Sequence, residues 1–282
     1  MTAIAAAPRF RRAVAVLGLL AVCGVVRPAA AQAPSTPAAG PQRIHGIYMN
    51  GCIAGAQPLP LEGPGYEVIR VSRNRYWGHA RAVEFVREFG RAIDRLGLSH
   101  VYIGDISQPR GGRMSFGHAS HQVGLDIDIW FEQSKRPRIP VAKREEPVLR
   151  SLVLKGEAGI DDAVWQPAHA ILLRTAAQAP EVDRIFVNKW IKHRLCETTT
   201  GDRAWLRKIV PWYYHDAHFH VRLHCPPGDR GCVAQAPVPS GDGCGKALAD
   251  WFALPDPSTL PQGPAIRPPK PPAACETVLA GP

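Results

Sequence analysis

The sequence predicts an α+β fold in which a central, mainly antiparallel sheet is flanked by helices. Polar and apolar residues alternate over 218–223, which is the pattern of a half-buried strand. Residues 80–96 carry apolar side chains three and four positions apart and precede Gly97, which indicates an amphipathic helix. Aromatic and β-branched residues at 66–72 and apolar residues at 101–104 predict a strand on each side of this helix.

The second half of the chain continues the mixture of helices and strands. Pro167 can begin a helix that runs past Ala176 and ends before Pro180. Residues 184–187 predict another short strand, and the charged, proline-containing residues 132–146 predict a loop. The sequence contains no internal repeat and no second apolar core, so we expect one domain.

The 282 residues divide by composition into four parts. Residues 1–31 indicate a secretory signal peptide, because arginines precede a short apolar run that ends in small residues. Residues 32–43 are rich in Ala, Pro, Gln and Ser and predict a flexible lead-in. We expect residues 44–253 to form the folded domain and residues 254–282 to form a proline-rich tail.

Charge and cysteine content fit an exported protein. The net charge of +10 falls to about +6 without residues 1–31, which is mildly basic and suits an anionic polymer such as cell wall. No cluster of Lys and Arg interleaved with aromatic residues indicates nucleic-acid binding, and no segment after the signal peptide is apolar enough to span a membrane. Six of the seven cysteines follow residue 31, and this even number predicts disulfides in an oxidising compartment.

Histidines and aspartates gather in two short segments. The candidates are His118, His121, Asp126 and Asp128 in the first segment and His215, His218 and His220 in the second. Imidazole and carboxylate together are typical of zinc sites, and a catalytic zinc takes three protein ligands and leaves one position for water. We therefore expect a metal held by His121, His220 and one of the two aspartates, which share a strand face and are not distinguished by spacing.

The remaining histidines of the two segments suggest further roles. His218 shares a strand face with His220 and is a candidate general base or oxyanion stabiliser. His118 and His215 are candidates for additional ligands, substrate contacts or groups that support the ligands. A single histidine on a strand is more often structural, so the metal hypothesis depends on the coincidence of both segments.

Sequence signatures of other hydrolases are absent. The sequence has no His-Glu-x-x-His of helix-borne zinc proteases, no Ser-x-x-Lys of penicillin-binding serine enzymes and no Gly-x-Ser-x-Gly elbow. A Ser/His/Asp triad without that elbow stays open. A cysteine nucleophile does not fit cysteines that are all paired.

Five motifs occur in order along the chain and cover roughly residues 45–275. They are Ser115-Phe-Gly-His-x-Ser-His-Gln-x-Gly-Leu-Asp-x-Asp-Ile-Trp130, Arg184-Ile-Phe-Val-Asn188, Asp202-Arg-x-Trp-Leu-Arg-Lys208, His215-x-Ala-His-x-His-Val-Arg-Leu223 and Ser240-Gly-Asp-Gly-Cys-Gly245. Together they resemble the penicillin-insensitive murein endopeptidases, which belong to the lysostaphin and D-Ala-D-Ala zinc metallopeptidase group. The resemblance implies that residues 44–253 form a zinc peptidase domain.

The resemblance implies a periplasmic enzyme that hydrolyses peptide cross-links in peptidoglycan, chiefly the D-alanyl–meso-diaminopimelyl bond. It implies zinc ligands at His118, His121, Asp128 and His220 and catalytic roles for His218 and His215. Only one zinc site is expected, because residues 155–162 lack the histidine of a second zinc motif found in some members.

The resemblance also implies the disulfides Cys52–Cys275, Cys196–Cys244 and Cys225–Cys232, the first of which would tie the tail to the domain. Two other functions stay open. A zinc D,D-carboxypeptidase or dipeptidase acting on wall peptides shares the same motif pair, and a non-catalytic wall-binding protein could keep the metal for structure. The spare histidine at 218 favours an enzyme, because a structural zinc needs no extra base.

Overall fold

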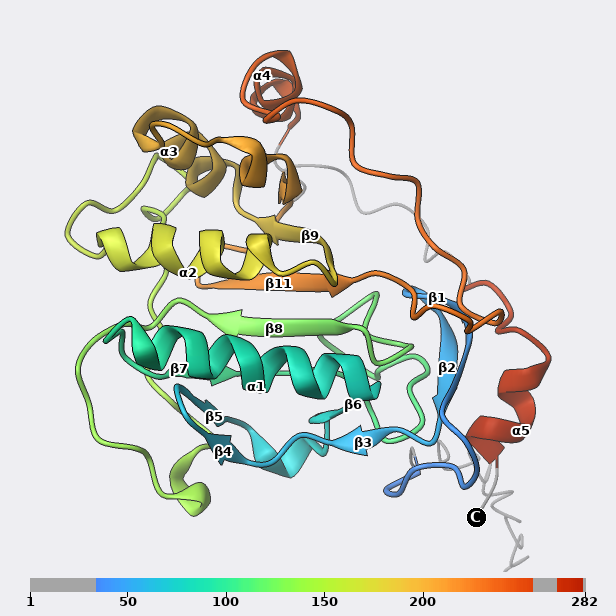
Figure 1. The fold of residues 1–282 in the computed structure, drawn as a ribbon. Coiled ribbons are helices and arrows are strands. Elements are labelled where there is room, and N and C mark those ends of the chain that lie inside the picture. Colours follow the sequence, from blue (N-terminus) through green and yellow to red (C-terminus); the bar gives the residue numbers. More distant parts are fainter. Residues whose placement is uncertain (1–33, 256–267, 281–282) are drawn as a thin grey trace, which may run out of the picture. The chain divides into compact units, whose positions relative to one another are not determined.

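The computed structural model describes residues 34–255 and 268–280 (Figure 1). The predicted signal peptide, residues 1–31, lies outside the described residues, and so do residues 256–267 of the predicted tail. Within the described part of the chain, no helix combines the length and the apolar character needed to cross a membrane.

The centre of the fold is a seven-stranded sheet with the strand order β10-β9-β11-β8-β7-β5-β4. Its strands are β4 (Glu62–Gly63), β5 (Tyr66–Val68), β7 (Val101–Ile103), β8 (Asp126–Trp130), β9 (Val182–Val187), β10 (Ile209–Pro211) and β11 (His218–Leu223). Two further pairs are β1 (Arg43–Ile47) with β2 (Asn50–Ala54) and β3 (Gln57–Pro58) with β6 (Trp77–Gly78). β8 and β11 come from distant parts of the sequence and are adjacent in the middle of the main sheet (Figure 1).

The α+β class is confirmed, but the sheet is mixed, so the prediction of a mainly antiparallel sheet was wrong. β5 pairs with β7 and β9 pairs with β10 in parallel, whereas β11 is antiparallel to both β8 and β9. In each parallel pair a helix lies between the strands in sequence: α1 (Ala80–Arg95) in the first and α3 (Lys189–Thr198) in the second. A helical crossover returns the chain so that the second strand runs in the same direction as the first.

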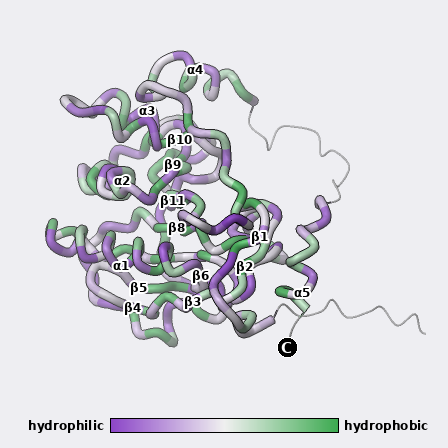
Figure 2. Tube along the Cα trace, turned by 45° about the vertical axis from the view of Figure 1, so that its right-hand side comes forward, coloured by the Kyte–Doolittle hydropathy of each residue, from purple (hydrophilic) through white to green (hydrophobic). Residues whose placement is uncertain are grey.

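The helices α1 and α2 (Pro167–Gln178) cover one face of the sheet (Figure 1). Phe219 of β11 packs edge-on against Phe89 of α1, and Ile127 of β8 and Val221 of β11 are fully buried. Hydropathy changes repeatedly along both helices, as expected of helices that bury one side (Figure 2). Because side chains alternate along a strand, the residues between these apolar positions face away from α1.

The structure confirms most of the predicted elements. The helix predicted at 80–96, the helix beginning at Pro167 and the strands at 101–104, 184–187 and 218–223 all occur with small changes at their ends. The strand predicted at 66–72 is shorter, because β5 ends at Val68. A 3-10 turn, η1 (Val71–Arg73), follows, and Arg70 between them has a φ of 55°, which a strand cannot accommodate.

Residues 34–42 of the predicted lead-in make hydrogen bonds to the domain. Oε1 of Gln42 accepts the N–H of Ala80 at the start of α1, and Nε2 of Gln42 donates to the Gly55 carbonyl. Nε of Arg110 donates to the Thr36 carbonyl. This part of the lead-in is therefore attached to the domain.

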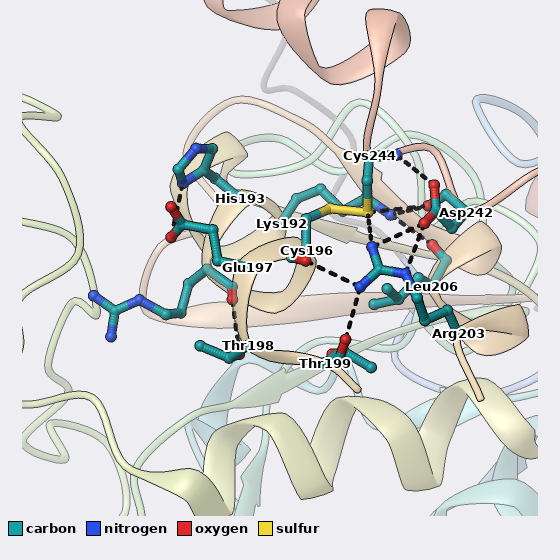
Figure 3. Close-up of a disulfide and its surroundings, with 11 residues drawn as sticks. Lys192, His193, Cys196, Glu197, Thr198, Thr199, Arg203, Leu206, Asp242 and Cys244 are labelled. Carbon is teal, nitrogen blue, oxygen red and sulfur yellow. Dashed lines mark hydrogen bonds and ion pairs between the residues drawn. A yellow bond between two sulfur atoms is a disulfide. The ribbon is translucent and has the colours of Figure 1, made fainter. Parts of the chain in front are cut away.

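Three disulfides join Cys52–Cys275, Cys196–Cys244 and Cys225–Cys232, which confirms the implied pairing. The first joins β2 to α5 (Ala274–Ala280), so the end of the tail is tied to the start of the domain. The second joins α3 to the segment before α4 (Lys246–Ala253). Figure 3 shows it beside Arg203, which donates to the Thr199 carbonyl and pairs with Asp242.

Removing the Cys52–Cys275 disulfide should lower the free energy of unfolding by about 5 kcal/mol, because the bond closes a very long loop of the unfolded chain. Its cysteines are 223 positions apart, whereas those of Cys225–Cys232 are 7 apart. Removing the short-range bond should cost only about 2–3 kcal/mol. Denaturant unfolding of the paired Cys→Ser variants measures both values, and equal losses would contradict this expectation.

A neutral histidine lies at the N-terminal end of each of the helices α1 and α2. His79 is the N-cap of α1, and His169 lies in the first turn of α2. Nδ1 of His79 accepts the N–H of Arg81 at 3.1 Å, and Nδ1 of His169 accepts the N–H of Gln166 at 3.0 Å. Burial lowers the pKa of each histidine to about 4. A protonated ring nitrogen has no lone pair, so protonation removes both hydrogen bonds.

We expect the free energy of unfolding to fall as the pH falls from 6.5 to about 4. Between these values the unfolded chain binds protons at His79 and His169 that the folded chain does not bind, so acid favours unfolding. His79→Asn keeps a capping acceptor without titrating and should remove on the order of 2 kcal/mol of this pH dependence. Chemical unfolding at several pH values measures the difference, and parallel pH curves for the two proteins would contradict the assignment.

Candidate metal centre

β8 and β11 bring the two predicted segments together. In their antiparallel register, His220 lies directly opposite Asp128, and Arg222 lies directly opposite Asp126. Directly opposed residues of an antiparallel pair point to the same face of the sheet and are close neighbours. These four side chains therefore form one polar group on the face away from α1.

The loop before β8 adds His118 and His121 to this group. His121 has a left-handed φ of 65°, which is uncommon for a residue other than glycine. Two hydrogen bonds hold it: its backbone N–H donates to Oδ2 of Asp126 at 2.9 Å, and its Nδ1 pairs with the Ile106 carbonyl at 2.8 Å. A carbonyl oxygen can only accept, so Nδ1 carries a proton, and Nε2 is the nitrogen that can offer its lone pair to a proton or a metal ion.

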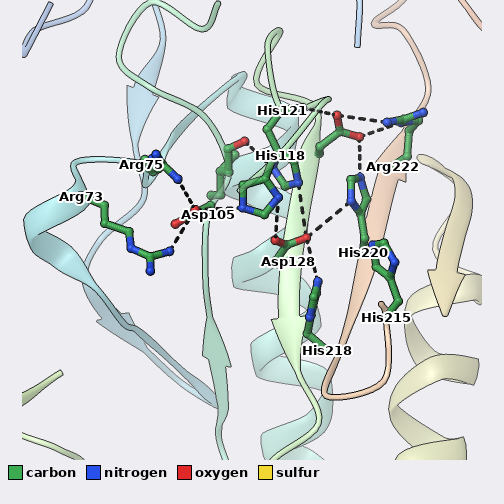
Figure 4. Close-up of polar contacts among 12 residues, drawn as sticks. Arg73, Arg75, Asp105, His118, His121, Asp128, His215, His218, His220 and Arg222 are labelled. Carbon is green, nitrogen blue, oxygen red and sulfur yellow. Dashed lines mark hydrogen bonds and ion pairs between the residues drawn. The ribbon is translucent and has the colours of Figure 1, made fainter. Parts of the chain in front are cut away.

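Asp128 is the common neighbour of four histidines (Figure 4). Its Oδ1 lies 3.4 Å from Nε2 of His121, 3.5 Å from Nδ1 of His220 and 3.8 Å from Nε2 of His218. Its Oδ2 lies 3.6 Å from Nδ1 of His118. His118, His121 and Asp128 each offer a ligand atom within 4.8 Å of the other two.

The ring nitrogens that face away from Asp128 bind oxygen acceptors. Nε2 of His220 pairs with Oδ1 of Asp126 at 2.8 Å, and Nε2 of His118 pairs with Oδ2 of Asp105 at 3.0 Å. His121 uses the backbone carbonyl described above. Metal-binding histidines have this arrangement, in which an outer carboxylate or carbonyl fixes the tautomer and the orientation of the ring.

Two buried atoms of the centre, Nε2 of His121 and Oδ1 of Asp128, have no hydrogen-bond partner among the described residues. The two residues are only 0% and 3% exposed. An unpaired polar atom in such a position costs free energy, and these two face each other at 3.4 Å. A divalent cation would accept a lone pair from both. The residues therefore fit a metal ion, and a set of imidazoles with one carboxylate suits zinc.

The charges of the centre also favour a cation. Burial alone would raise the pKa of Asp128, but the imidazoles around it, His121 first, hold that pKa well below its usual range. Burial alone would lower the pKa of His121, but the carboxylates of Asp128 and Asp126 raise it to about 9. The centre thus attracts a proton to the position where a metal ion would bind in its place.

His218 and His215 lie beside this centre. The side chain of His218 is 17% exposed, whereas those of His121 and His220 are 0% and 6% exposed, so His218 is the more accessible to solvent. Nδ1 of His215 pairs with the Tyr213 carbonyl at 2.5 Å, and its ring centroid lies 5.0 Å from that of His218. Burial lowers the pKa of both, to about 3 for His215, so both are neutral at neutral pH.

Comparison with known proteins extends over most of the chain. The chain is 46% identical over 237 residues to a penicillin-insensitive murein endopeptidase of Haemophilus influenzae, covering 84% of this chain and 82% of that protein. Proteins with the same name from Klebsiella pneumoniae and Escherichia coli are 42% and 41% identical over 266 and 269 residues, with at least 94% of each chain covered. The profile of the penicillin-insensitive murein endopeptidase family matches residues 44–280. The chain belongs to this family.

This member of the murein endopeptidase family has all the predicted site residues in one place. They are His118, His121, Asp128, His215, His218 and His220. Asp105 and Arg75 were not among the predicted site residues. Asp105 directly follows the strand at 101–104 and pairs with His118, and Arg75 donates to Asp105 at 2.8 Å. The position of an aspartate at the end of a predicted strand was the available signal for Asp105.

Proposed function

We propose that this protein is a periplasmic zinc metalloendopeptidase that hydrolyses D-alanyl–meso-diaminopimelyl cross-links in peptidoglycan and is insensitive to penicillin. Membership of the family supports murein endopeptidase activity, and the predicted signal peptide supports export. The metal proposal rests above all on Nε2 of His121 and Oδ1 of Asp128, two buried atoms that have no hydrogen-bond partner among the described residues. Insensitivity to penicillin fits a sequence without a Ser-x-x-Lys nucleophile that a β-lactam could acylate.

His118, His121, Asp128 and His220 would hold one zinc ion. The short distances among His118, His121 and Asp128, and the 3.5 Å between His220 and Asp128, support this set. A bound zinc ion supplies Lewis acidity that activates water and polarises the scissile carbonyl.

His218 would act as the general base and then as the general acid. Its neutral imidazole can accept the proton that the attacking water loses and return it to the amino group that leaves, so the protein ends the turnover in its starting protonation state. His215 already donates Nδ1–H to the Tyr213 carbonyl, so its Nε2 can only accept. It would orient a substrate N–H or the ring of His218.

Digestion of purified cross-linked muropeptide dimers by the zinc-loaded protein, with and without a chelator, tests the proposal. Mass spectrometry should detect monomers with a new amine on diaminopimelate and a new carboxyl on D-alanine, in the metal-loaded sample alone. If the dimers survive zinc-loaded protein, the endopeptidase proposal fails. Release of terminal D-alanine from a monomeric pentapeptide, with dimers intact, would indicate a D,D-carboxypeptidase, and wall binding without turnover would indicate a non-catalytic protein.

A further inference from the structure

Arg70 is a cation close to the metal centre whose guanidinium forms no hydrogen bond or ion pair with any residue that the structure describes. Its neighbours differ in this respect. Nη1 of Arg73 and Nη1 of Arg75 both lie within ion-pair distance of Oδ2 of Asp105, at 3.4 and 2.8 Å, and Figure 4 shows both side chains directed at this carboxylate. A guanidinium offers five N–H donors, so those of Arg70 are available to a ligand.

An aromatic stack holds Arg70 beside the candidate catalytic residue. The guanidinium carbon of Arg70 lies 5.0 Å from the ring centroid of Trp130. The ring of Trp130 in turn lies 4.9 Å from the ring of His218. Stacking on an indole orients a guanidinium but leaves the donors in its plane free, so Arg70 is held one ring away from His218.

The backbone at Arg70 is fixed in an unusual conformation. Its φ of 55° and ψ of 45° lie in the left-handed region, which is unfavourable for a residue with a Cβ. Its N–H donates to the Arg144 carbonyl at 2.8 Å, and its carbonyl accepts the N–H of Arg73 at 3.0 Å. Such strained residues concentrate at functional sites, where the surrounding structure holds them in place. This turn ends β5 early and places the side chain over Trp130.

The carboxylates that act electrostatically on Arg70 are already occupied. Asp105, Asp128 and Glu145 are the negative groups whose fields act on Arg70. Glu145 accepts the backbone N–H and the hydroxyl of Ser72. Asp105 is paired with arginine and histidine, and Asp128 faces the histidines of the centre. Arg70 can therefore accept an anionic group from outside the protein.

We propose that Arg70 is a specificity-determining residue that binds the substrate carboxylate next to the scissile bond. This proposal deepens the proposed endopeptidase function and rests on it. In the D-alanyl–diaminopimelyl cross-link, the scissile nitrogen is attached to a carbon that also carries a free carboxylate. A guanidinium binds a carboxylate through two parallel hydrogen bonds. A terminal D-alanyl-D-alanine has its carboxylate in the same position, so Arg70 would select for this feature rather than for the rest of the diaminopimelyl group.

The test compares dimers in which this carboxylate is free or amidated, using the full-length, zinc-loaded protein. Amidation should lower kcat/KM of the wild type by about 10²-fold, and Arg70→Ala should lower it by a similar factor on the free acid. Amidation should then have little further effect on Arg70→Ala. Arg70→Lys keeps the charge without the stacked fork and should recover only part of the loss. Arg73→Ala is the matched control and should keep the wild-type response to amidation.

Unchanged kcat/KM in Arg70→Ala, or an equal response to amidation in Arg70→Ala and the wild type, would overturn the assignment. Thermal unfolding and zinc content show whether a variant is folded, and Arg70→Lys replaces Arg70→Ala if the latter is not. Calorimetric binding of N-acetyl-D-alanine and its amide to wild type and variant separates the two proposals. If the wild type cleaves no dimers, the endopeptidase proposal fails. In that case, tighter binding of the acid than of the amide, lost in the Arg70 variant, still supports carboxylate binding by Arg70. Equal binding of the acid and the amide by the wild type overturns the proposal for Arg70.

Discussion

Replacing His218 with alanine should lower the rate of cross-link hydrolysis by roughly 10²- to 10⁴-fold, because the variant lacks the group that moves the proton. Zinc content should be unchanged. The candidate ligands closest to one another are His118, His121 and Asp128, and none of them depends on His218 for a hydrogen bond. Turnover of muropeptide dimers and elemental analysis of the same sample measure the two effects together.

His224→Ala provides the matched control. His224 directly follows β11, and its side chain is 54% exposed, so its loss should change neither turnover nor zinc content. Wild-type turnover in His218→Ala would contradict the assignment of a general base. Loss of zinc together with activity would instead identify His218 as a ligand.

Replacing Asp126 with asparagine should weaken zinc binding by about 10- to 100-fold and lower the free energy of unfolding by about 3–5 kcal/mol. Asp126 accepts hydrogen bonds from Nε2 of His220, from the backbone N–H of His121 and from two nitrogens of Arg222. Burial alone would raise the pKa of Asp126, but Arg222 and His220 lower it, so the carboxylate stays ionised. Asparagine supplies one acceptor instead of two and leaves the charge of Arg222 buried without its partner.

Two measurements separate these effects. Denaturant unfolding in the presence of a chelator reports the stability of the metal-free protein, and competition with a chromophoric chelator reports zinc affinity. Asp250→Asn is the control, because among the described residues Asp250 pairs only with Lys246 on the surface of α4, and this exposed pair should contribute at most about 1 kcal/mol. If the free energy of unfolding and the zinc affinity of Asp126→Asn both match those of the wild type, Asp126 does not hold His121 and His220 together.

Local sequence patterns predicted the helices and strands that bury one face and expose the other. The strand at 218–223 was found because burial of Phe219 and Val221 requires a period of two. The helix at 80–96 was found because its apolar side chains share one face. Strand direction is not encoded in this way. A helix between two strands permits a parallel pair such as β5 and β7, but it does so only if the two strands are neighbours. The pattern of a single strand does not reveal its neighbour.

The site was predictable in composition but not in register. Spacing placed Asp126 and Asp128 on one face, and only the pairing of β8 with β11 shows that Asp128 lies opposite His220 while Asp126 lies opposite Arg222. The left-handed conformation of Arg70 is another feature without a local signal, because no glycine or asparagine marks that position. Both features depend on contacts between residues far apart in the sequence.

The most direct test of the proposed zinc endopeptidase is a zinc titration of the metal-free protein, with the hydrolysis of purified muropeptide dimers measured at each step. Activity should rise with bound zinc and reach its maximum at one zinc per chain, held by the residues around Asp128. Full activity in the metal-free protein would contradict a zinc-dependent endopeptidase. So would intact dimers after one equivalent of zinc has bound.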